Sequence, residues 1–145
     1  MADWHVDDLG LSAPDYGRSL RGLGINLLVR AIRPQLEFQA EVLGATIVRA
    51  DDSFAVLRFG EAEWMLHVDE SYHQNPLLGH VRGARVRGAG CELRLYGRDP
   101  DVAEAACREL GCTVLQPAAT KPHGLREAFL LCPDGYCWVP GAPVA

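Results

Sequence analysis

The sequence contains no apolar run close to the roughly 20 residues of a membrane-spanning helix, so we expect no such span. Residues 1–19 are acidic and lack the apolar core of a signal peptide, so we expect no export signal. Acidic residues outnumber basic residues, 19 to 14. The resulting net charge of −5 argues against nucleic-acid binding, which needs a basic surface. These absences predict a cytoplasmic globular protein, with 145 residues forming one domain or two small halves around one core.

Cysteine is present, but not in the spacing of a structural zinc site. Four of the five cysteines form the pairs Cys107 with Cys112 and Cys132 with Cys137, whereas such zinc sites use closer spacings. Cys132 and Cys137 flank a predicted turn and could face each other, but we expect reduced thiols because no export signal is visible. A GxxxxGK[ST] motif is also missing, so the glycines do not predict a phosphate-binding loop.

A repeated segment organises what is present. Residues 43–48 read Leu-Gly-Ala-Thr-Ile-Val, and residues 110–115 read Leu-Gly-Cys-Thr-Val-Leu. Each copy follows a helix-like run and leads into a β-branched run, with a glycine at the joint. Two copies so far apart indicate an internally duplicated domain rather than a solenoid.

The first half reads as a strand, a helix and three strands. Alternating apolar residues predict a strand over 25–30, and Pro34 suits the first position of a helix with a core stripe at Leu36, Ala40 and Leu43. Gly44 suits the residue after the helix. Further strands are predicted over 46–49, 54–59 and 63–68.

The second half repeats this order. A strand over 91–97 precedes a helix with Asp99 as N-cap, Pro100 at its first position, and a stripe of Val102, Ala106 and Leu110. Strands over 113–116, 126–132 and 136–139 follow, with a loop over 117–124 and a tight turn at 133–135. Two βαβββ modules predict the α+β class.

These elements define the expected organisation. Residues 1–20 form a loosely ordered N-terminal arm, and residues 21–145 form one domain. Its modules span about 22–70 and 88–140. The loop over 71–87 that joins them is a linker or a flap over a site, because loops of this length inside a compact domain are usually one or the other.

Strand alternation places a set of side chains on the faces opposite the helices, where they would line a groove. A mixed apolar and polar lining is typical of a small-molecule site. His67 and Glu92 could pair as acid and base, although an ordinary half-buried histidine and a solvated sheet face explain them equally well. Trp64 and Trp138 are expected in core or interface packing. The expected ligand-binding residues are Asn26, Met65, His67, Glu92, Arg94 and Tyr96, together with His123 and Arg126 from a loop that could gate the groove; Leu28, Cys137 and Val139 complete its walls.

With its two βαβββ halves, its LG(A/C)T joints and the ending Leu-Leu-Cys-Pro-Asp-Gly-Tyr at 130–136, the chain resembles the vicinal oxygen chelate superfamily. This is the glyoxalase, bleomycin resistance and extradiol dioxygenase group. The resemblance covers about residues 22–140 and implies a curved mixed sheet around a groove. Cys132 stands where the frequent "DPDG" ending has its first Asp.

The resemblance also implies where a metal would bind. The ligand positions of the metal enzymes align with Gly24, His67, Glu92 and Val139, and only His67 and Glu92 can bind an ion. His123, His73 or Asn26 could fill in. Two side-chain ligands bind a divalent cation weakly. We therefore expect no complete metal site and no other cofactor, and keep a divalent metal at His67 and Glu92 as the alternative.

The leading hypothesis is a small-molecule-binding protein of the glyoxalase/bleomycin resistance type, with an unknown ligand held by apolar contact plus Glu92 and Arg94. The alternative is a metal-dependent lyase, isomerase or dioxygenase using His67 and Glu92, so whether the chain is an enzyme stays open. A third hypothesis is a regulatory module whose own side chains fill the groove. A homodimer is expected from the resemblance and from the prevalence of two-fold dimers, with no nucleic acid or membrane as partner.

Overall fold

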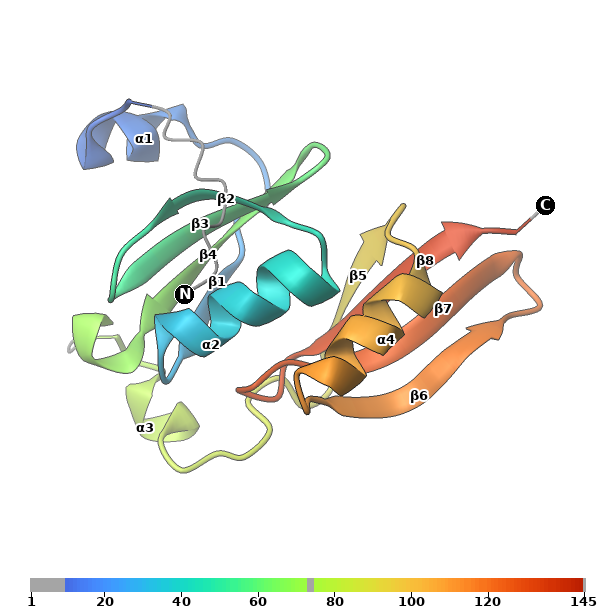
Figure 1. Cartoon of the computed structure of the whole chain (residues 1–145). Coiled ribbons are helices and arrows are strands. Elements are labelled where there is room, and N and C mark those ends of the chain that lie inside the picture. Colours follow the sequence, from blue (N-terminus) through green and yellow to red (C-terminus); the bar gives the residue numbers. More distant parts are fainter. Residues whose placement is uncertain (1–9, 73–74, 145) are drawn as a thin grey trace.

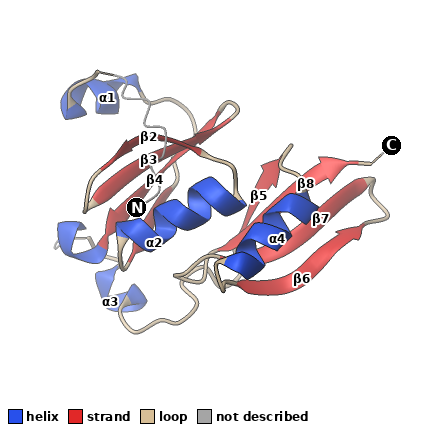
Figure 2. Cartoon of the chain, viewed as in Figure 1, coloured by secondary structure: helices blue, strands red, loops and turns tan. Residues whose placement is uncertain are grey.

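The computed structural model describes residues 10–72 and 75–144, which form two four-stranded sheets with a helix packed on each (Figures 1 and 2). The first sheet has the strand order β1-β4-β3-β2 and the second the order β5-β8-β7-β6. The strands of the first sheet are β1 (Asn26–Val29), β2 (Thr46–Ala50), β3 (Phe54–Phe59) and β4 (Ala62–Val68). Those of the second are β5 (Glu92–Tyr96), β6 (Thr113–Thr120), β7 (Leu125–Leu131) and β8 (Cys137–Pro143).

Both sheets have the same pattern of pairing. The first strand of each module runs parallel to the last, and the other neighbours are antiparallel. The parallel registers place Leu28 opposite His67 and Arg94 opposite Val139. The predicted α+β class and the two βαβββ modules are confirmed. The predicted loop over 117–124 is shorter than expected, because β6 continues to Thr120.

The helix of the first module begins earlier than its proline predicts. α2 (Ile32–Glu37) starts after Ala31, which makes no side-chain cap, so Pro34 lies at the third helical position rather than the first. α2 continues directly into a π-helical turn, η1 (Phe38–Val42). The helix α4 (Pro100–Glu109) confirms the predicted cap, since the Asp99 side chain accepts bonds from the backbone of residues 101 and 102.

The predicted core-facing stripe of α4 is right for Ala106, which packs against the core, and wrong for Val102 and Leu110. Ala103 and Cys107 are fully buried, whereas Val102 is 51% exposed and Leu110 is also exposed. Ala103 and Cys107 are four residues apart, so they share one helix face like the predicted stripe. The small side chains let α4 pack closely on the sheet and on η1 of the first module.

The repeated glycine joint serves both modules. Gly44 and Gly111 adopt φ of +67° and +71°, a region that side chains disfavour, so each ends its helix as predicted. Only Gly44 also carries a contact between modules. The Arg98 guanidinium lies over it, and Arg98 Nε donates to Val42 O at 2.9 Å and Nη2 to Glu41 O at 3.2 Å.

The connector between the modules, predicted as a linker or a flap, contains short elements of its own. It contains the 3₁₀ turn η2 (Asp69–Tyr72) and the short helix α3 (Leu78–Val81). Its last part is tied to the β7–β8 turn, since Arg87 N donates to Asp134 O at 3.1 Å and Gly88 N to Gly135 O at 3.3 Å. Nothing larger than glycine fits at 135, where a Cβ would lie 2.6 Å from the Val86 Cα.

A buried network around Asp134 joins the β7–β8 turn, to which the connector is tied, to the first module. Asp134 is 2% exposed, and its carboxylate accepts bonds from Arg30 N at 3.0 Å, Arg30 Nη1 at 2.9 Å and Gln35 Nε2 at 2.7 Å. Beside it, Arg87 donates two bonds to Asp69 at 2.7 and 2.8 Å. The pKa of Asp69 is lowered mainly by these bonds.

The N-terminal arm is more ordered than predicted. Residues 13–19 form a helix, α1 (Ala13–Ser19), capped by Ser12, and residues 1–9 lie outside the described part. Tyr16 donates to Glu63 Oε1 at 2.6 Å, and Arg49 Nη2 donates to Leu11 O at 2.8 Å. α1 therefore lies against the first sheet on the face opposite α2 (Figure 1), where it helps to bury Val56.

The five cysteines are free thiols in the structure. Cys107 and Cys132 are buried, and Cys132 Sγ accepts a bond from Gln35 Nε2 at 3.3 Å. None of the helices in the described ranges is long and apolar enough to cross a membrane.

Candidate functional site

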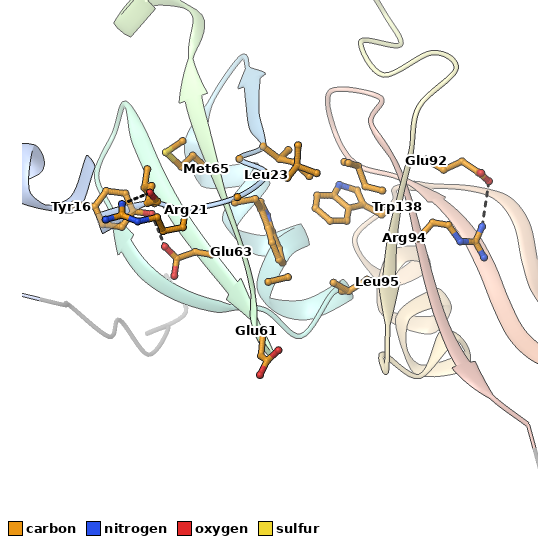
Figure 3. Close-up of a pocket in the computed structure, with 17 residues that line it drawn as sticks. Tyr16, Arg21, Leu23, Glu61, Glu63, Met65, Glu92, Arg94, Leu95 and Trp138 are labelled. Atoms are coloured by element: carbon orange, nitrogen blue, oxygen red, sulfur yellow. Dashed lines mark hydrogen bonds and ion pairs between the residues drawn. The ribbon is translucent and has the colours of Figure 1, made fainter. Parts of the chain in front are cut away.

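A cavity of about 670 Å³ lies between the two modules, with the segment before β1 and the start of β4 on one side and β5 on the other. β1 and β5 are edge strands of their sheets. Figure 3 shows the first module contributing one wall and β5 and β8 the other. The lining consists of Tyr16, Trp138 and residues 20–25, 61–65 and 92–95.

Two tryptophans, one from each module, pack against each other at the cavity. The rings of Trp64 and Trp138 have centroids 5.2 Å apart and are tilted by 47°, a favourable aromatic geometry. They are 4% and 3% exposed. Sequence reasoning placed both in packing alone; the structure places them in the core and in the lining of the cavity.

The two indole N–H groups differ in their surroundings. Trp64 Nε1 donates to Gln39 Oε1 at 2.9 Å. Gln39 Nε2 donates to Gln35 Oε1 at 3.4 Å, and Gln35 Nε2 donates to the Asp134 carboxylate. This chain of buried hydrogen bonds fixes the Trp64 ring. Trp138 Nε1 is buried and has no hydrogen-bond partner among the described residues.

The segment before β1 forms one wall of the cavity. Leu23 is 88% exposed and Gly24 lies beside it in the lining. Tyr16 lines the same wall and is held by Glu63, whose other oxygen accepts from Arg58 Nη2 at 3.1 Å. Burial, followed by the bond to the Glu63 carboxylate, raises the pKa of Tyr16, so the phenol stays protonated at neutral pH.

Of the predicted ligand-binding residues, Met65, Glu92 and Arg94 line this cavity. Asn26 and His67 are instead paired on the face of the first sheet, with His67 Nδ1 2.5 Å from Asn26 Oδ1. The oxygen can only accept, so Nδ1 carries the proton and Nε2 the lone pair. Burial lowers the pKa of His67, partly opposed by Asp51, so the ring is neutral at pH 7.

Tyr96 and His123, the predicted residues not yet placed apart from Arg126, lie on the open face of the second sheet together with Arg94 and Glu92. Arg94 lies 3.7 Å from the Glu92 carboxylate, donates from Nε to the Tyr96 hydroxyl at 3.2 Å, and donates to Glu127. His123 Nε2 lies 3.5 Å from Glu127 Oε2. Glu127 is 3% exposed and was missed, although alternation from Phe129 along β7 would have placed it on this face.

Arg126 does not join this cluster. Its guanidinium makes two hydrogen bonds of 2.7 Å to the Asp101 carboxylate, at the start of α4. The planar donor fork that sequence analysis assigned to a ligand is therefore used to hold β7 on α4. That Arg126 and His123 help to gate a groove stays a prediction.

The two candidate metal ligands come from different modules. His67 belongs to the first sheet and Glu92 to the second, where its ion-pair partner is Arg94. Within residues 10–72 and 75–144, no three His, Cys, Asp or Glu side chains come together as an ion site would require. Val139 is buried and Gly24 has no side chain; His73 lies outside the described residues. The described residues of one chain therefore do not bring together the three or four ligands of a dedicated metal site.

Comparison by sequence finds no matching family model and no matching curated protein. Comparison of structures does find similar folds. A glyoxalase-related enzyme from Fulvimarina pelagi has a TM-score of 0.65 at 18% identity, covering 84% of this chain and 87% of that one. A glyoxalase/bleomycin resistance protein/dioxygenase from Nocardioides has a TM-score of 0.59 at 19% identity, covering 90% and 92%. A glyoxalase/bleomycin resistance protein/dioxygenase family enzyme from Burkholderia phytofirmans PsJN gives 0.64 at 16% identity, covering 83% and 97%. The chain thus has the vicinal oxygen chelate fold that its motifs predicted.

Proposed function

On the vicinal oxygen chelate fold, we propose that this chain is a small-molecule-binding protein whose ligand occupies the cavity between the segment before β1 and β5. The observation that carries the proposal is the cavity itself, about 670 Å³ in size, with Trp64 and Trp138 in its lining. That volume and a mainly apolar wall with a few polar groups are typical of small-molecule sites. Ile25, Met65 and Leu93 supply further apolar wall, and the charged groups lie around it.

The test is ligand-induced stabilisation with a variant that fills the cavity. A compound at 100 times its Kd stabilises the fold by about 2.7 kcal/mol, roughly 5–10 °C in Tm, so a thermal-shift screen detects it. Gly24→Trp places an indole in the cavity wall without backbone strain, because a Cβ there meets nothing within 4 Å. Gly79→Trp, equally unhindered but in α3, is the matched control.

We expect Gly24→Trp to abolish the shift caused by any compound that stabilises the wild type, and Gly79→Trp to retain it. A compound that stabilises both variants equally binds elsewhere, and would contradict the assignment of this cavity. If no compound of a broad apolar and aromatic library stabilises the wild type, the third hypothesis, a regulatory module with a self-filled groove, is favoured.

A metal-dependent lyase, isomerase or dioxygenase is the second candidate, and one observation favours it. The contact between His67 Nδ1 and Asn26 Oδ1 fixes the orientation of the imidazole ring, and metal-binding histidines are oriented by such contacts. Elemental analysis of protein purified without a histidine tag separates the candidates. We expect no stoichiometric divalent metal. A full equivalent that is lost in His67→Ala and in Glu92→Ala would replace ligand binding with the enzymatic function.

We also propose that the chain acts in the cytoplasm as a homodimer. α1 lies against the outer face of the first sheet, while Tyr96 on the corresponding face of the second sheet is 63% exposed. A second copy that covers this face would bury it. Sedimentation velocity over a range of protein concentrations tests this, and a single monomeric species at all concentrations would contradict it.

A further inference from the structure

The indole N–H of Trp138 is a buried donor that the described protein atoms leave without an acceptor. Indole N–H groups normally find a partner when buried, because an unpaired donor away from water is costly. The neighbouring Trp64 makes the contrast clear, since its own N–H bonds to Gln39 at 2.9 Å. One of the two cavity tryptophans is thus satisfied internally and the other is not.

The surroundings of Trp138 are apolar. Leu93 lies opposite it across the β5–β8 pairing, and Leu95 is a further lining side chain on the same strand. Figure 3 shows the indole projecting from β8, with its nitrogen on the side of the ring away from Leu95. Among the charged lining groups, Arg94 bonds to Glu127 and Glu63 bonds to Tyr16.

From this arrangement we infer that the ligand is a planar, largely uncharged compound that presents one hydrogen-bond acceptor, a carbonyl oxygen or ring nitrogen, to the N–H of Trp138. This inference rests on the proposed ligand-binding function and adds the chemical class of the ligand. The two aromatic rings provide the apolar contact, and the single donor gives orientation. A compound with only donor groups gains nothing at this position.

Access to the donor requires a small adjustment. The nitrogen is closed off from solvent in the structure, so a ligand that reaches it must shift a side chain of the cavity wall.

The experiment compares two probes of the same shape, quinoline and naphthalene, which differ by one ring nitrogen that can accept a hydrogen bond. Their affinities for the wild type, Trp138→Phe and Trp64→Phe are measured by calorimetry or fluorescence at mildly alkaline pH, where quinoline is neutral. Trp138→Phe removes the unpaired donor and keeps an aromatic ring. Trp64→Phe is the matched control, because its donor is already occupied by Gln39.

We expect the preference for quinoline over naphthalene to fall about five- to tenfold in Trp138→Phe, the value of one ordinary hydrogen bond, and to be unchanged in Trp64→Phe. Using the ratio cancels the different hydration of the probes. If both probes bind and the ratio is the same in all three proteins, the inference is overturned while the proposed function stands. If neither probe binds the wild type, the proposed function fails for aromatic ligands, and the inference fails with it.

A second readout does not depend on the variant folding. In a proton–nitrogen correlation spectrum of the wild type, quinoline should move the indole N–H signal of Trp138 downfield through the hydrogen bond, whereas naphthalene should move it only by its ring current and not downfield. A signal that moves equally with both probes would show ring proximity without a hydrogen bond, and would overturn the inference.

Discussion

The two repeated glycines offer a matched pair of substitutions. Gly111→Ala places a side chain at φ +71° with nothing within 4 Å of its Cβ. The strain of a left-handed alanine is about 1–2 kcal/mol, and the lower entropy of the unfolded chain offsets about 0.4–1 kcal/mol of it. We expect Gly111→Ala to cost about 1 kcal/mol of unfolding free energy.

Gly44→Ala carries the same backbone strain, at φ +67°, and an additional loss. Its Cβ would lie 2.9 Å from Nη1 and 3.1 Å from Cζ of Arg98, so the guanidinium must move away. That movement breaks the bonds from Arg98 to the Val42 and Glu41 carbonyls, worth about 1.5–3 kcal/mol for a charged donor. We expect Gly44→Ala to cost about 2.5–4 kcal/mol in total.

Urea denaturation followed by fluorescence and circular dichroism measures both costs, and coincident transitions check two-state behaviour. The decisive control is a double-mutant cycle with Arg98→Ala. Without the guanidinium, Gly44→Ala should cost no more than Gly111→Ala. Equal costs in the wild-type background, or a difference that persists without Arg98, would refute the claim that this arginine caps the helix of the other module.

Three further outcomes follow from the contacts described above. Asp134→Ala should lower the free energy of unfolding, measured with urea, by about 3–5 kcal/mol, because it leaves buried donors without an acceptor. Asp15→Ala breaks an exposed pair and should cost under about 1 kcal/mol, so similar costs for the two variants would contradict the role of the network. The pKa of Asp69 is lower in the folded state than in the unfolded chain, so its contribution to the free energy of unfolding is present above about pH 4 and is lost as the pH falls further. Asp69→Asn should flatten this part of the curve of stability against pH, and an unchanged curve would contradict the role given to the Asp69–Arg87 pair. Tyr16→Phe should speed amide hydrogen exchange in residues 13–19 with little change in global stability, and the control Tyr96→Phe should leave that exchange unaltered. Protection that survives in Tyr16→Phe would show that the bond to Glu63 does not hold α1.

Local features of the fold could be predicted from the sequence because their causes are local. Asp99 and Pro100 define a helix start from neighbouring residues alone, and Gly44 and Gly111 define helix ends. The strand positions followed from alternation, which also placed Met65 and His67 on the face away from the helix. The start of α2 was misplaced because Ala31 provides no cap that could be recognised.

Features that depend on contacts between modules could not be predicted. The placement of Arg98 over Gly44 and the pairing of Trp64 with Trp138 join residues from different modules. Single-strand patterns give the face of a residue, but not which residue of the other module it meets. Within the second module, the pattern of β7 also did not reveal that Arg126 meets Asp101 on α4. The cavity lies between the two modules, and no periodicity of one strand reveals it.

The central claim is that a small molecule binds between the two modules, beside the paired tryptophans. The most direct measurement is a naphthalene titration followed in the indole region of the proton–nitrogen spectrum. We expect the Trp64 and Trp138 signals of the wild type to shift and saturate together, and to stay in place in Gly24→Trp. Signals that do not move in the wild type, or that move equally in Gly24→Trp, would contradict the claim.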